Sequence, residues 1–279
     1  MSGGRVIVAQ ISDLHIKRRS ELAYGRVDTA AALSRCIAAL NGFAPRPDLV
    51  VISGDLCDTP NADEYAHLKS LLAELKLPFV AVPGNHDDRT LFRAALPAQP
   101  YAQSGGALNI TTAAGDLDIL LLDSSVPGAA HGELDAATLT WLDAALGASA
   151  TRPALVFLHH PPFVTGIGHM DAQNLRNAAA LEAVLRRHPR VRLVAAGHVH
   201  RATLTTFAGV AATICPAPNH AVALDLDAAL PPSLMIEPPA FHLHVWFADD
   251  GFGSVVTHWV PIGDFVGPHP FFGLDGRML

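Results

Sequence analysis

Residues 6–15, VIVAQISDLH, show the pattern that decides the fold: an apolar run that ends in a short polar motif. The same pattern returns at residues 49–58 (LVVISGDLCD), 79–88 (FVAVPGNHDD), 154–162 (ALVFLHHPP) and 191–200 (VRLVAAGHVH). Short, continuous apolar runs of this kind are typical of buried strands. Because α/β sheets bind ligands outside the carboxyl ends of their strands, five such loops with Asp, Asn or His indicate one site.

Between these strands the sequence predicts helices, and beyond residue 200 a β-rich half follows the mostly parallel βαβ half. We expect helices over residues 27–43, 63–75, 88–96 and 177–188, and another that begins at Asp135. We expect hairpins over residues 108–122 and 202–214, and strands over 241–247 and 254–260 around a turn at Asp249-Asp250-Gly251. These elements predict an α/β fold of two packed mixed β-sheets flanked by helices, an αββα sandwich.

The domain organisation and the composition limit the function. We expect one domain over residues 1–260 and a tail, residues 261–279, that lies on the surface or contacts another subunit. The net charge of −7 and the lack of a basic run argue against a nucleic acid polymer as partner. No stretch approaches the ~20 apolar residues of a membrane span, and no signal peptide is apparent, so we expect a cytoplasmic protein without membrane association. Three widely spaced cysteines suit reduced thiols.

The residue types in the five motifs are those of a metal site. Imidazole suits first-row transition metals, and carboxylate and amide oxygens suit harder ions such as manganese. The candidate ligands are Asp13, His15, Asp55, Asn85, His159, His198 and His200. Seven donors are too many for one tetrahedral zinc ion, so they favour two metals that share a bridging carboxylate.

The same donors predict the chemistry. Two divalent ions would bring four positive charges against the two negative charges of Asp13 and Asp55, so the site would attract an anionic phosphate ester. Paired metals ~3.5–4 Å apart can activate a water and stabilise both oxygens of an in-line displacement. We expect two divalent or mixed-valence transition metals, with iron and manganese ahead of zinc and cobalt, and attack by a metal-bound hydroxide.

Each motif alone has a simpler structural explanation. Residues 13–15 (DLH) could be a cap or a surface pair, and residues 54–55 (GD) could simply start a loop. Residues 159–161 (HHP) could be a turn with one buried and one exposed histidine. The occurrence of all five motifs, each after a strand, favours the metal site.

Together the five motifs resemble those of the calcineurin-like metallophosphoesterase superfamily, over residues 13–200. By that resemblance one metal is held by Asp13, His15 and His200, the other by Asn85, His159 and His198, and Asp55 bridges them. The resemblance also implies that His86 binds phosphate or acts as the acid, paired with Asp58, and it selects His159 over His160. His86 and Asp58 are therefore the expected catalytic residues.

Two segments narrow the resemblance. Residues 84–89 (GNHDDR) and 159–162 (HHPP) resemble bacterial class III cyclic nucleotide phosphodiesterases and the related glycerophosphodiesterases. This implies a small phosphodiester as substrate, with a cyclic nucleotide of the 3′,5′-cAMP type as first choice. A glycerophosphodiester, or a broad specificity, is the alternative. Two other classes stay open: a phosphomonoesterase and a non-catalytic interaction protein on the same fold.

The expected substrate contacts are Asn85, His86, His169, Asn177 and His220. Asn177 is the last residue of a segment that resembles the part of those enzymes lying next to the substrate. His169 lies in a loop that could act as a lid over the site, or it only caps the helix. His220 either faces the pocket or is an ordinary loop histidine. The phenylalanines of the tail could bury a subunit interface or pack on the domain itself, and we expect a homo-oligomer, a dimer or higher.

Overall fold

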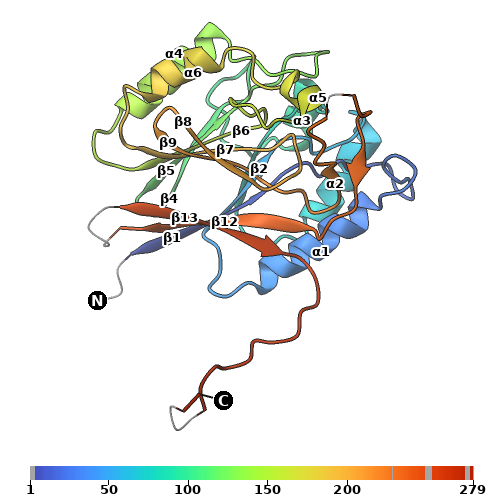
Figure 1. The fold of residues 1–279 in the computed structure, drawn as a ribbon. Helices are drawn as coiled ribbons and strands as arrows, with labels where there is room; N and C mark the ends of the chain where they lie inside the picture. The colour runs from blue at the N-terminus through green and yellow to red at the C-terminus, as the bar shows by residue number, and fades with distance from the viewer. Residues whose placement is uncertain (1–3, 228, 249–252, 274–276, 279) are drawn as a thin grey trace.

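The computed structural model describes residues 4–227, 229–248, 253–273 and 277–278, which form two packed β-sheets (Figure 1). The strands of the first sheet are β1 (Arg5–Ile11), β2 (Leu49–Ser53), β3 (Phe79–Val82), β12 (Ala240–Phe247) and β13 (Ser254–Pro261). Their order is β13-β12-β1-β2-β3. β1, β2 and β3 are parallel, and β12 and β13 extend the sheet in antiparallel pairing.

The second sheet has the order β4-β5-β6-β7-β9-β8, with parallel strands in the middle and antiparallel pairs at both edges. Its strands are β4 (Ile110–Ala114), β5 (Leu117–Leu122), β6 (Ala154–Leu158), β7 (Val191–Ala196), β8 (Thr203–Phe207) and β9 (Val210–Ile214). A separate small ribbon pairs β10 (Ala221–Val222) with β11 (Leu234–Met235). All five predicted motif strands are present, three in the first sheet and two in the second.

Helices cover the outer faces of both sheets, which confirms the αββα sandwich (Figure 1). The first sheet packs against α1 (Thr29–Gly42), α2 (Ala62–Leu72) and α3 (Arg89–Ala95). The second packs against α4 (Ala136–Gly147), α5 (Gly168–Asp171) and α6 (Ala178–Leu185). No helix in the described ranges is long and apolar enough to cross a membrane.

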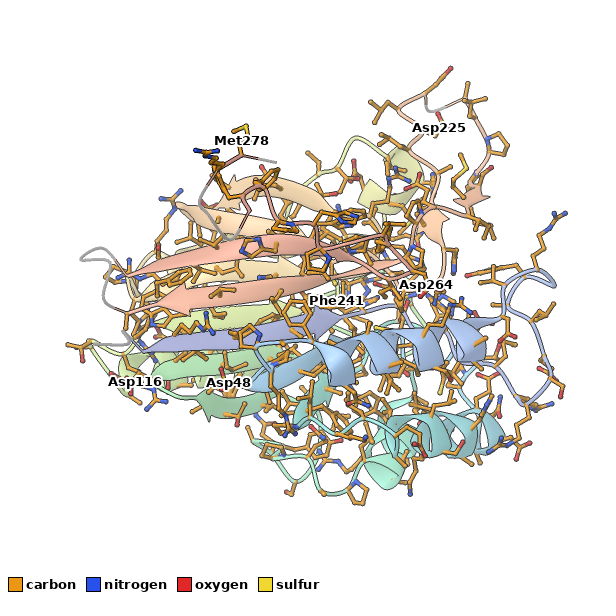
Figure 2. All side chains as sticks on the ribbon, turned by 90° about the horizontal axis from the view of Figure 1, so that it is seen from below. Asp48, Asp116, Asp225, Phe241, Asp264 and Met278 are labelled. Carbon is orange, nitrogen blue, oxygen red and sulfur yellow. The ribbon has the colours of Figure 1, made fainter. Side chains whose placement is uncertain are left out.

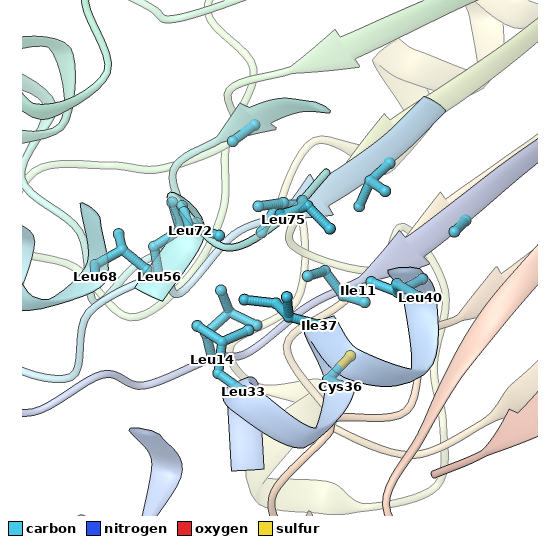
Figure 3. Close-up of a cluster of buried hydrophobic side chains, with 14 of the residues drawn as sticks. Ile11, Leu14, Leu33, Cys36, Ile37, Leu40, Leu56, Leu68, Leu72 and Leu75 are labelled. Carbon is cyan, nitrogen blue, oxygen red and sulfur yellow. The ribbon is translucent and has the colours of Figure 1, made fainter. Parts of the chain in front are cut away.

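Side-chain alternation along β1 builds two different cores. Ile7, Ala9 and Ile11 face α1, where Figure 3 shows Ile11 close to the leucine and isoleucine side chains of that helix. Val6 and Val8 point the other way, into the core between the two sheets. Successive strand residues point to opposite faces, so a strand that is buried on both faces must be apolar at nearly every position.

The helix limits differ from the predicted ones because of capping. α1 begins at Thr29 rather than at residue 27, since the Asp28 side chain accepts a hydrogen bond from the Ala31 amide. α2 starts one residue early because Asn61 caps its first turn, and it ends at Leu72, three residues before the predicted end. Cys36, Cys57 and Cys215 are buried free thiols.

The last two strands do not form a separate β-rich half, as the sequence suggested. β12 pairs with β1, so the end of the chain completes the first sheet. The predicted turn at residues 249–251 lies outside the described residues. Beyond Ile262 the tail runs away from the body in Figure 1, and it leaves Phe265, Val266 and Phe271 exposed.

The two ends of the sandwich carry different structures (Figure 2). Asp48 lies at the end where the parallel strands begin, and its carboxylate accepts a hydrogen bond from the Ile7 amide at 2.8 Å. Asp225, at the opposite end, belongs to the segment that connects β10 with β11. The five polar motifs lie at that second end, because they follow the carboxyl ends of the strands.

Candidate metal centre

Hydrogen bonds tie the five motif loops together across both sheets. The Asp13 amide donates to the Gly54 carbonyl at 3.0 Å, which joins the loops after β1 and β2. The Gly197 amide donates to the His159 carbonyl at 2.9 Å, which joins the loops after β6 and β7. The His198 amide donates to the Asp13 carboxylate at 3.0 Å and thereby links the two sheets. The predicted ligands therefore converge on one place.

The first predicted metal position is a tight cluster of side chains. Donor atoms of Asp13, His15 and His200 lie within 4.8 Å of one another, and all three residues are buried. The Asp55 carboxylate lies beside this cluster, with Oδ2 3.5 Å from His15 Nε2. The same Oδ2 is 3.3 Å from His159 Nε2, so Asp55 stands between the two predicted metal positions.

The second predicted position holds one more histidine than expected. Asn85 Oδ1 lies 3.1 Å from His159 Nε2, and His159 clusters with His198 as predicted. His160, which the resemblance set aside, belongs to the same cluster of donors. Its Nδ1 pairs with the Ser124 hydroxyl at 2.8 Å, while its buried Nε2 has no partner among the described residues.

The orientation of the imidazole rings tests whether the residues fit metal ions. The Nδ1 atoms of His15 and His200 lie 3.2 Å from the Asp58 carboxylate and from the His220 carbonyl, and these oxygens can only accept. In neutral rings the two Nε2 atoms then carry lone pairs, yet they face each other at 3.2 Å. A cation between them would satisfy both, and this donor set of imidazole, carboxylate and amide groups fits transition metals.

A second observation points the same way. His198 Nε2 is buried and has no hydrogen-bond partner among the residues that the structure describes. A buried polar atom without a partner costs free energy, and bound metal is one way to remove that cost. The residues therefore fit a two-metal centre.

Burial and neighbouring charges shift the pKa values of the side chains in the centre. Burial raises the pKa of Asp13, His159 pulls it down and the nearby Asp55 carboxylate adds to the rise, and together they bring it to about 6. Burial also works to raise the pKa of Asp55, but His159 and His86 pull it well below its ordinary value. Burial lowers the pKa of His159, but Asp55 more than offsets this and brings the pKa to about 9. Asp55 is thus the carboxylate that stays ionised.

The histidines from β7 behave differently. Burial, followed by neighbouring histidines, holds the pKa of His198 and of His200 well below its usual value. Both rings are therefore neutral at pH 7, which is the form that binds metal ions.

The backbone of the centre is strained. Asp13, His15, Asp55, His198 and His200 all have positive φ angles, between 47° and 74°. Such left-handed conformations are unfavourable for residues other than glycine and cluster at functional sites. Glycine occurs where a side chain would collide with the centre: a Cβ at Gly54 would strike the His159 ring, and one at Gly84 would strike the Asp55 carboxylate.

His86 and Asp58 lie at the site, but their pairing differs from the predicted one. The His86 amide donates to Asp55 Oδ1 at 2.9 Å, and the His86 Nδ1 pairs with the Asp58 carbonyl at 2.7 Å. The Asp58 carboxylate is directed elsewhere, to His15 Nδ1 at 3.2 Å and to the Lys17 ammonium at 3.1 Å. Asp58 thus positions His86 through its backbone and a predicted metal ligand through its side chain.

A pocket of about 290 Å³ opens over the centre. Asn85, His86, His169 and His220 line it, as the sequence predicted, and so does Tyr24, whose ring lies 5.2 Å from that of His220. The sequence carries no signal for Tyr24, because it sits in an irregular loop that only the fold brings to the site.

Asn177 does not lie in this pocket. Its side-chain oxygen accepts from the Leu134 amide at 3.0 Å, and its nitrogen donates to the Leu134 carbonyl at 2.7 Å. Both ends of the amide therefore join α6 to the loop before α4, and the side chain is directed to Leu134. Gln173, four residues earlier in the chain, lines the pocket instead.

Asp87 has a structural role that the sequence did not reveal. Its carboxylate accepts hydrogen bonds from the amides of Leu56 and Gly84, both at 3.0 Å, and from the Tyr65 hydroxyl at 2.9 Å. It therefore joins the loop after β2 to the loop after β3. Burial raises the pKa of Asp87 to about 6.

Comparison with known proteins gives one consistent family. The family model described as calcineurin-like phosphoesterase matches residues 7–202. The chain is 36% identical over 275 residues to the probable glycerophosphodiester phosphodiesterase GpdQ of Arcobacter nitrofigilis, covering 98% of this chain and 100% of that protein. It is 32% identical over 197 residues to the 3′,5′-cyclic adenosine monophosphate phosphodiesterase CpdA of Escherichia coli, covering 71% and 70%. The crystal structure of a dimetal phosphatase from Danio rerio shares the fold, with a TM-score of 0.60 at 16% identity over 92% of this chain and 99% of that one.

Proposed function

The chain belongs to the calcineurin-like phosphoesterase family, and on that premise we propose that it is a metal-dependent phosphodiesterase that hydrolyses a small phosphodiester. The observation that supports this most directly is the position of Asp55 Oδ2, between His15 Nε2 and His159 Nε2 at 3.5 and 3.3 Å. A carboxylate between two groups of other donors is the arrangement that a bridged metal pair needs.

We assign Asp13, His15 and His200 to one metal and Asn85, His159 and His198 to the other, with Asp55 shared. When bound, the ions supply activation of a water and stabilisation of the oxygens that enter and leave phosphorus. Iron or manganese remains our first choice, since the donor set lacks thiolate. His160 is close enough to serve as an extra donor in the second group.

His86 is our candidate for handling the leaving group. Because its Nδ1 is held by the Asp58 carbonyl, Nε2 is the ring nitrogen that remains for a ligand in the pocket. To give a proton to the departing oxygen, His86 must enter the reaction as an imidazolium with a proton on Nε2. As a phosphate-binding group it would donate a hydrogen bond from the same Nε2 proton.

The relative extent of the matches favours a glycerophosphodiester as first substrate. GpdQ of Arcobacter nitrofigilis, which is named as a probable glycerophosphodiesterase, matches nearly the whole chain, including the β12–β13 region, whereas CpdA matches 71% of it. The cyclic nucleotide stays as second candidate, because residues 84–89 and the similarity to CpdA support it. We further propose that the exposed phenylalanines of the tail contact another copy of the chain.

A substrate panel with added Mn²⁺ tests the proposal. It should contain an aryl phosphodiester, the matching aryl monoester, glycerophosphodiesters, and 3′,5′- and 2′,3′-cyclic nucleotides. We expect the diester to be cleaved faster than the monoester and a glycerophosphodiester to be the best natural substrate. Faster cleavage of the monoester would contradict the proposal, and faster cleavage of a cyclic nucleotide would reverse the order of the two candidates.

The variant Asn85→Ala tests whether this site performs the reaction. It should greatly reduce aryl diester turnover, because it removes a proposed ligand. Asn41→Ala is the control, since Asn41 bonds the backbone of Glu74 and Lys76 at the surface. Equal activity of wild type and Asn85→Ala would show that this site does not perform the reaction.

A further inference from the structure

The core between the two sheets changes character beneath the metal centre. Along most of its length it is apolar, with valine, isoleucine, leucine and phenylalanine side chains from both sheets. Near the carboxyl ends of the strands it contains the polar side chains of Gln10, Ser53 and His244, which are no more than 1% exposed. Burying polar groups costs free energy unless each one is hydrogen-bonded, so such a group calls for an explanation.

Gln10 joins the two sheets through one nitrogen. Its Nε2 donates to the Ser53 hydroxyl at 2.8 Å, on β2 of its own sheet. The same Nε2 donates to the Ala196 carbonyl at 3.0 Å, on β7 of the other sheet. Ser53 and Ala196 are the last residues of their strands, directly before the loops that hold Asp55 and His198.

His244 fixes the orientation of this amide. The Gln10 Oε1 lies 3.0 Å from His244 Nε2, and because an amide oxygen can only accept, that nitrogen must carry the ring proton. The other ring nitrogen, Nδ1, then accepts from the Thr257 hydroxyl on β13 at 2.8 Å. With His244 in this tautomer, the Gln10 amide cannot turn over without losing two of its three hydrogen bonds, those with the Ala196 carbonyl and with His244. The Ser53 hydroxyl can donate as well as accept, so it does not fix the orientation.

The hydrogen bonds of Gln10 continue through Ser53 to a predicted metal ligand, His159. The Ser53 carbonyl lies 2.9 Å from His159 Nδ1, and the Ser12 hydroxyl donates to the same oxygen at 3.1 Å. This carbonyl holds the proton of His159 on Nδ1 and leaves Nε2 free to face Asn85 and Asp55. Gln10 therefore bonds to the ends of two strands that deliver ligands from opposite sheets.

We propose that Gln10, oriented by His244, is an inter-sheet clamp that sets the spacing between the ligands from the first sheet and those from the second. Without the clamp, the ends of β2 and β7 lose one direct tie between the two sheets, and the spacing between the ligands that follow them changes. Gln10 and His244 touch no substrate and are positioning residues. The inference rests on the proposed two-metal centre, but it is tested by metal binding and not by turnover.

The experiment compares Mn²⁺ binding by the full chain and its variants at pH 7.5. His244→Phe removes the donor to Gln10, and Gln10→Met removes the amide at similar volume. His242→Phe is the matched control, since His242 is also buried on β12, and its Nδ1 has no hydrogen-bond partner within the described parts of the chain. His244→Gln is the conservative rescue, because a glutamine amide can donate to the same Gln10 oxygen.

Two readouts separate positioning from general damage. Competition with a chelator gives the affinity of each Mn²⁺ ion, and the electron paramagnetic resonance spectrum of the two-ion form reports the coupling between them. We expect His244→Phe and Gln10→Met to lower the affinity for the second Mn²⁺ ion about 10-fold. This is the low end of the range for residues that hydrogen-bond to metal ligands. We expect them also to alter the coupled spectrum. His242→Phe should change neither, and His244→Gln should restore both.

Other outcomes overturn the clamp. It is wrong if His244→Phe binds both ions as His242→Phe does, or if His244→Gln is as impaired as His244→Phe. If Gln10→Met does not fold, by thermal unfolding of the metal-free chain, Thr257→Val on half-buried β13 takes its place, and unchanged binding by that variant counts against the proposal. A wild-type chain that binds fewer than two ions would overturn the proposed metal centre itself.

Discussion

The core under α1 and the carboxyl edge of the two sheets are equally buried but are built on opposite principles. The core is lined by apolar side chains such as Ile11, Leu33 and Leu40 in ordinary helix and strand conformations. The edge buries carboxylates and histidines, five of them at positive φ, and leaves buried nitrogens without a partner among the described residues.

The difference shows where the stability of the molecule comes from. Burial of apolar area stabilises the core, whereas each left-handed residue at the edge costs about 1–3 kcal/mol. The core must therefore stabilise a site that would be unfavourable without its ligands. Mutations in the two regions should accordingly separate stability from activity.

The largest expected effect comes from the edge. Asp55→Asn removes the charge that both metal positions share, so kcat for an aryl diester should fall by more than the ~10–100-fold typical of outer partners of a metal. Asp48→Asn is the control at the other end of β2, where the carboxylate accepts a hydrogen bond from the Ile7 amide and lies far from the metal centre (Figure 2). Steady-state kinetics with Mn²⁺ will measure both. Comparable losses in the two variants would remove the distinction between the two ends.

The core should respond in stability. Leu33→Ala removes a fully buried side chain from the cluster between α1 and the first sheet, which should cost about 2–5 kcal/mol of unfolding free energy. The activity of the folded fraction should stay near that of wild type. Urea unfolding of the metal-free chain will measure the cost, with Leu204→Ala as the control, because Leu204 is 75% exposed. A loss of activity per folded molecule in Leu33→Ala would contradict the separation of stability in the core from activity at the edge.

A smaller effect concerns pH and the polar end of the inter-sheet core. Burial lowers the pKa of His242 from 6.5 to about 4. The unfolded chain therefore takes up this proton first, so the contribution of His242 to stability is complete above pH 6.5 and is lost as the pH falls toward 4. Between pH 7 and 5 the loss is about 2 kcal/mol. Urea unfolding without metal should show that His242→Phe loses less stability than wild type over this interval; an identical loss would refute the assignment.

The smallest effect on the fold should come from the tail. Deleting residues 263–279 removes exposed side chains such as Phe265 and Phe271, so the unfolding free energy should change by less than about 0.5 kcal/mol. If the tail contacts another copy, as proposed, light scattering should show a smaller assembly after the deletion. A large loss of stability in the monomer would instead place the tail in the core.

The sequence predicted the strand ends and the candidate ligands because both are local features. An apolar run and the polar residue that follows it are adjacent in the chain, so β1 with Asp13 and β2 with Asp55 could be read directly. The convergence of the five loops followed from the rule for α/β sheets. Which strands share a sheet could not be predicted from local sequence. β12, for example, pairs with β1, which lies more than 200 residues earlier.

The features that were missed depend on contacts distant in sequence. Gln10 and His244 are 234 residues apart, and neither belongs to a recognisable motif. The side chain of Asn177 is turned away from the pocket by Leu134, 43 residues earlier. Asp87 lies within residues 84–89, but its role depends on Tyr65 and Leu56, which reach it only in the folded chain.

The central claim is that ligands from two sheets form one two-metal centre. The most direct test is the number of Mn²⁺ ions bound per chain, measured by elemental analysis after equilibrium dialysis, for wild type and for His159→Ala. We predict two ions for wild type and a single retained ion for the variant, since Asp13, His15 and His200 stay in place. One ion or none in wild type, or two in the variant, would contradict the account.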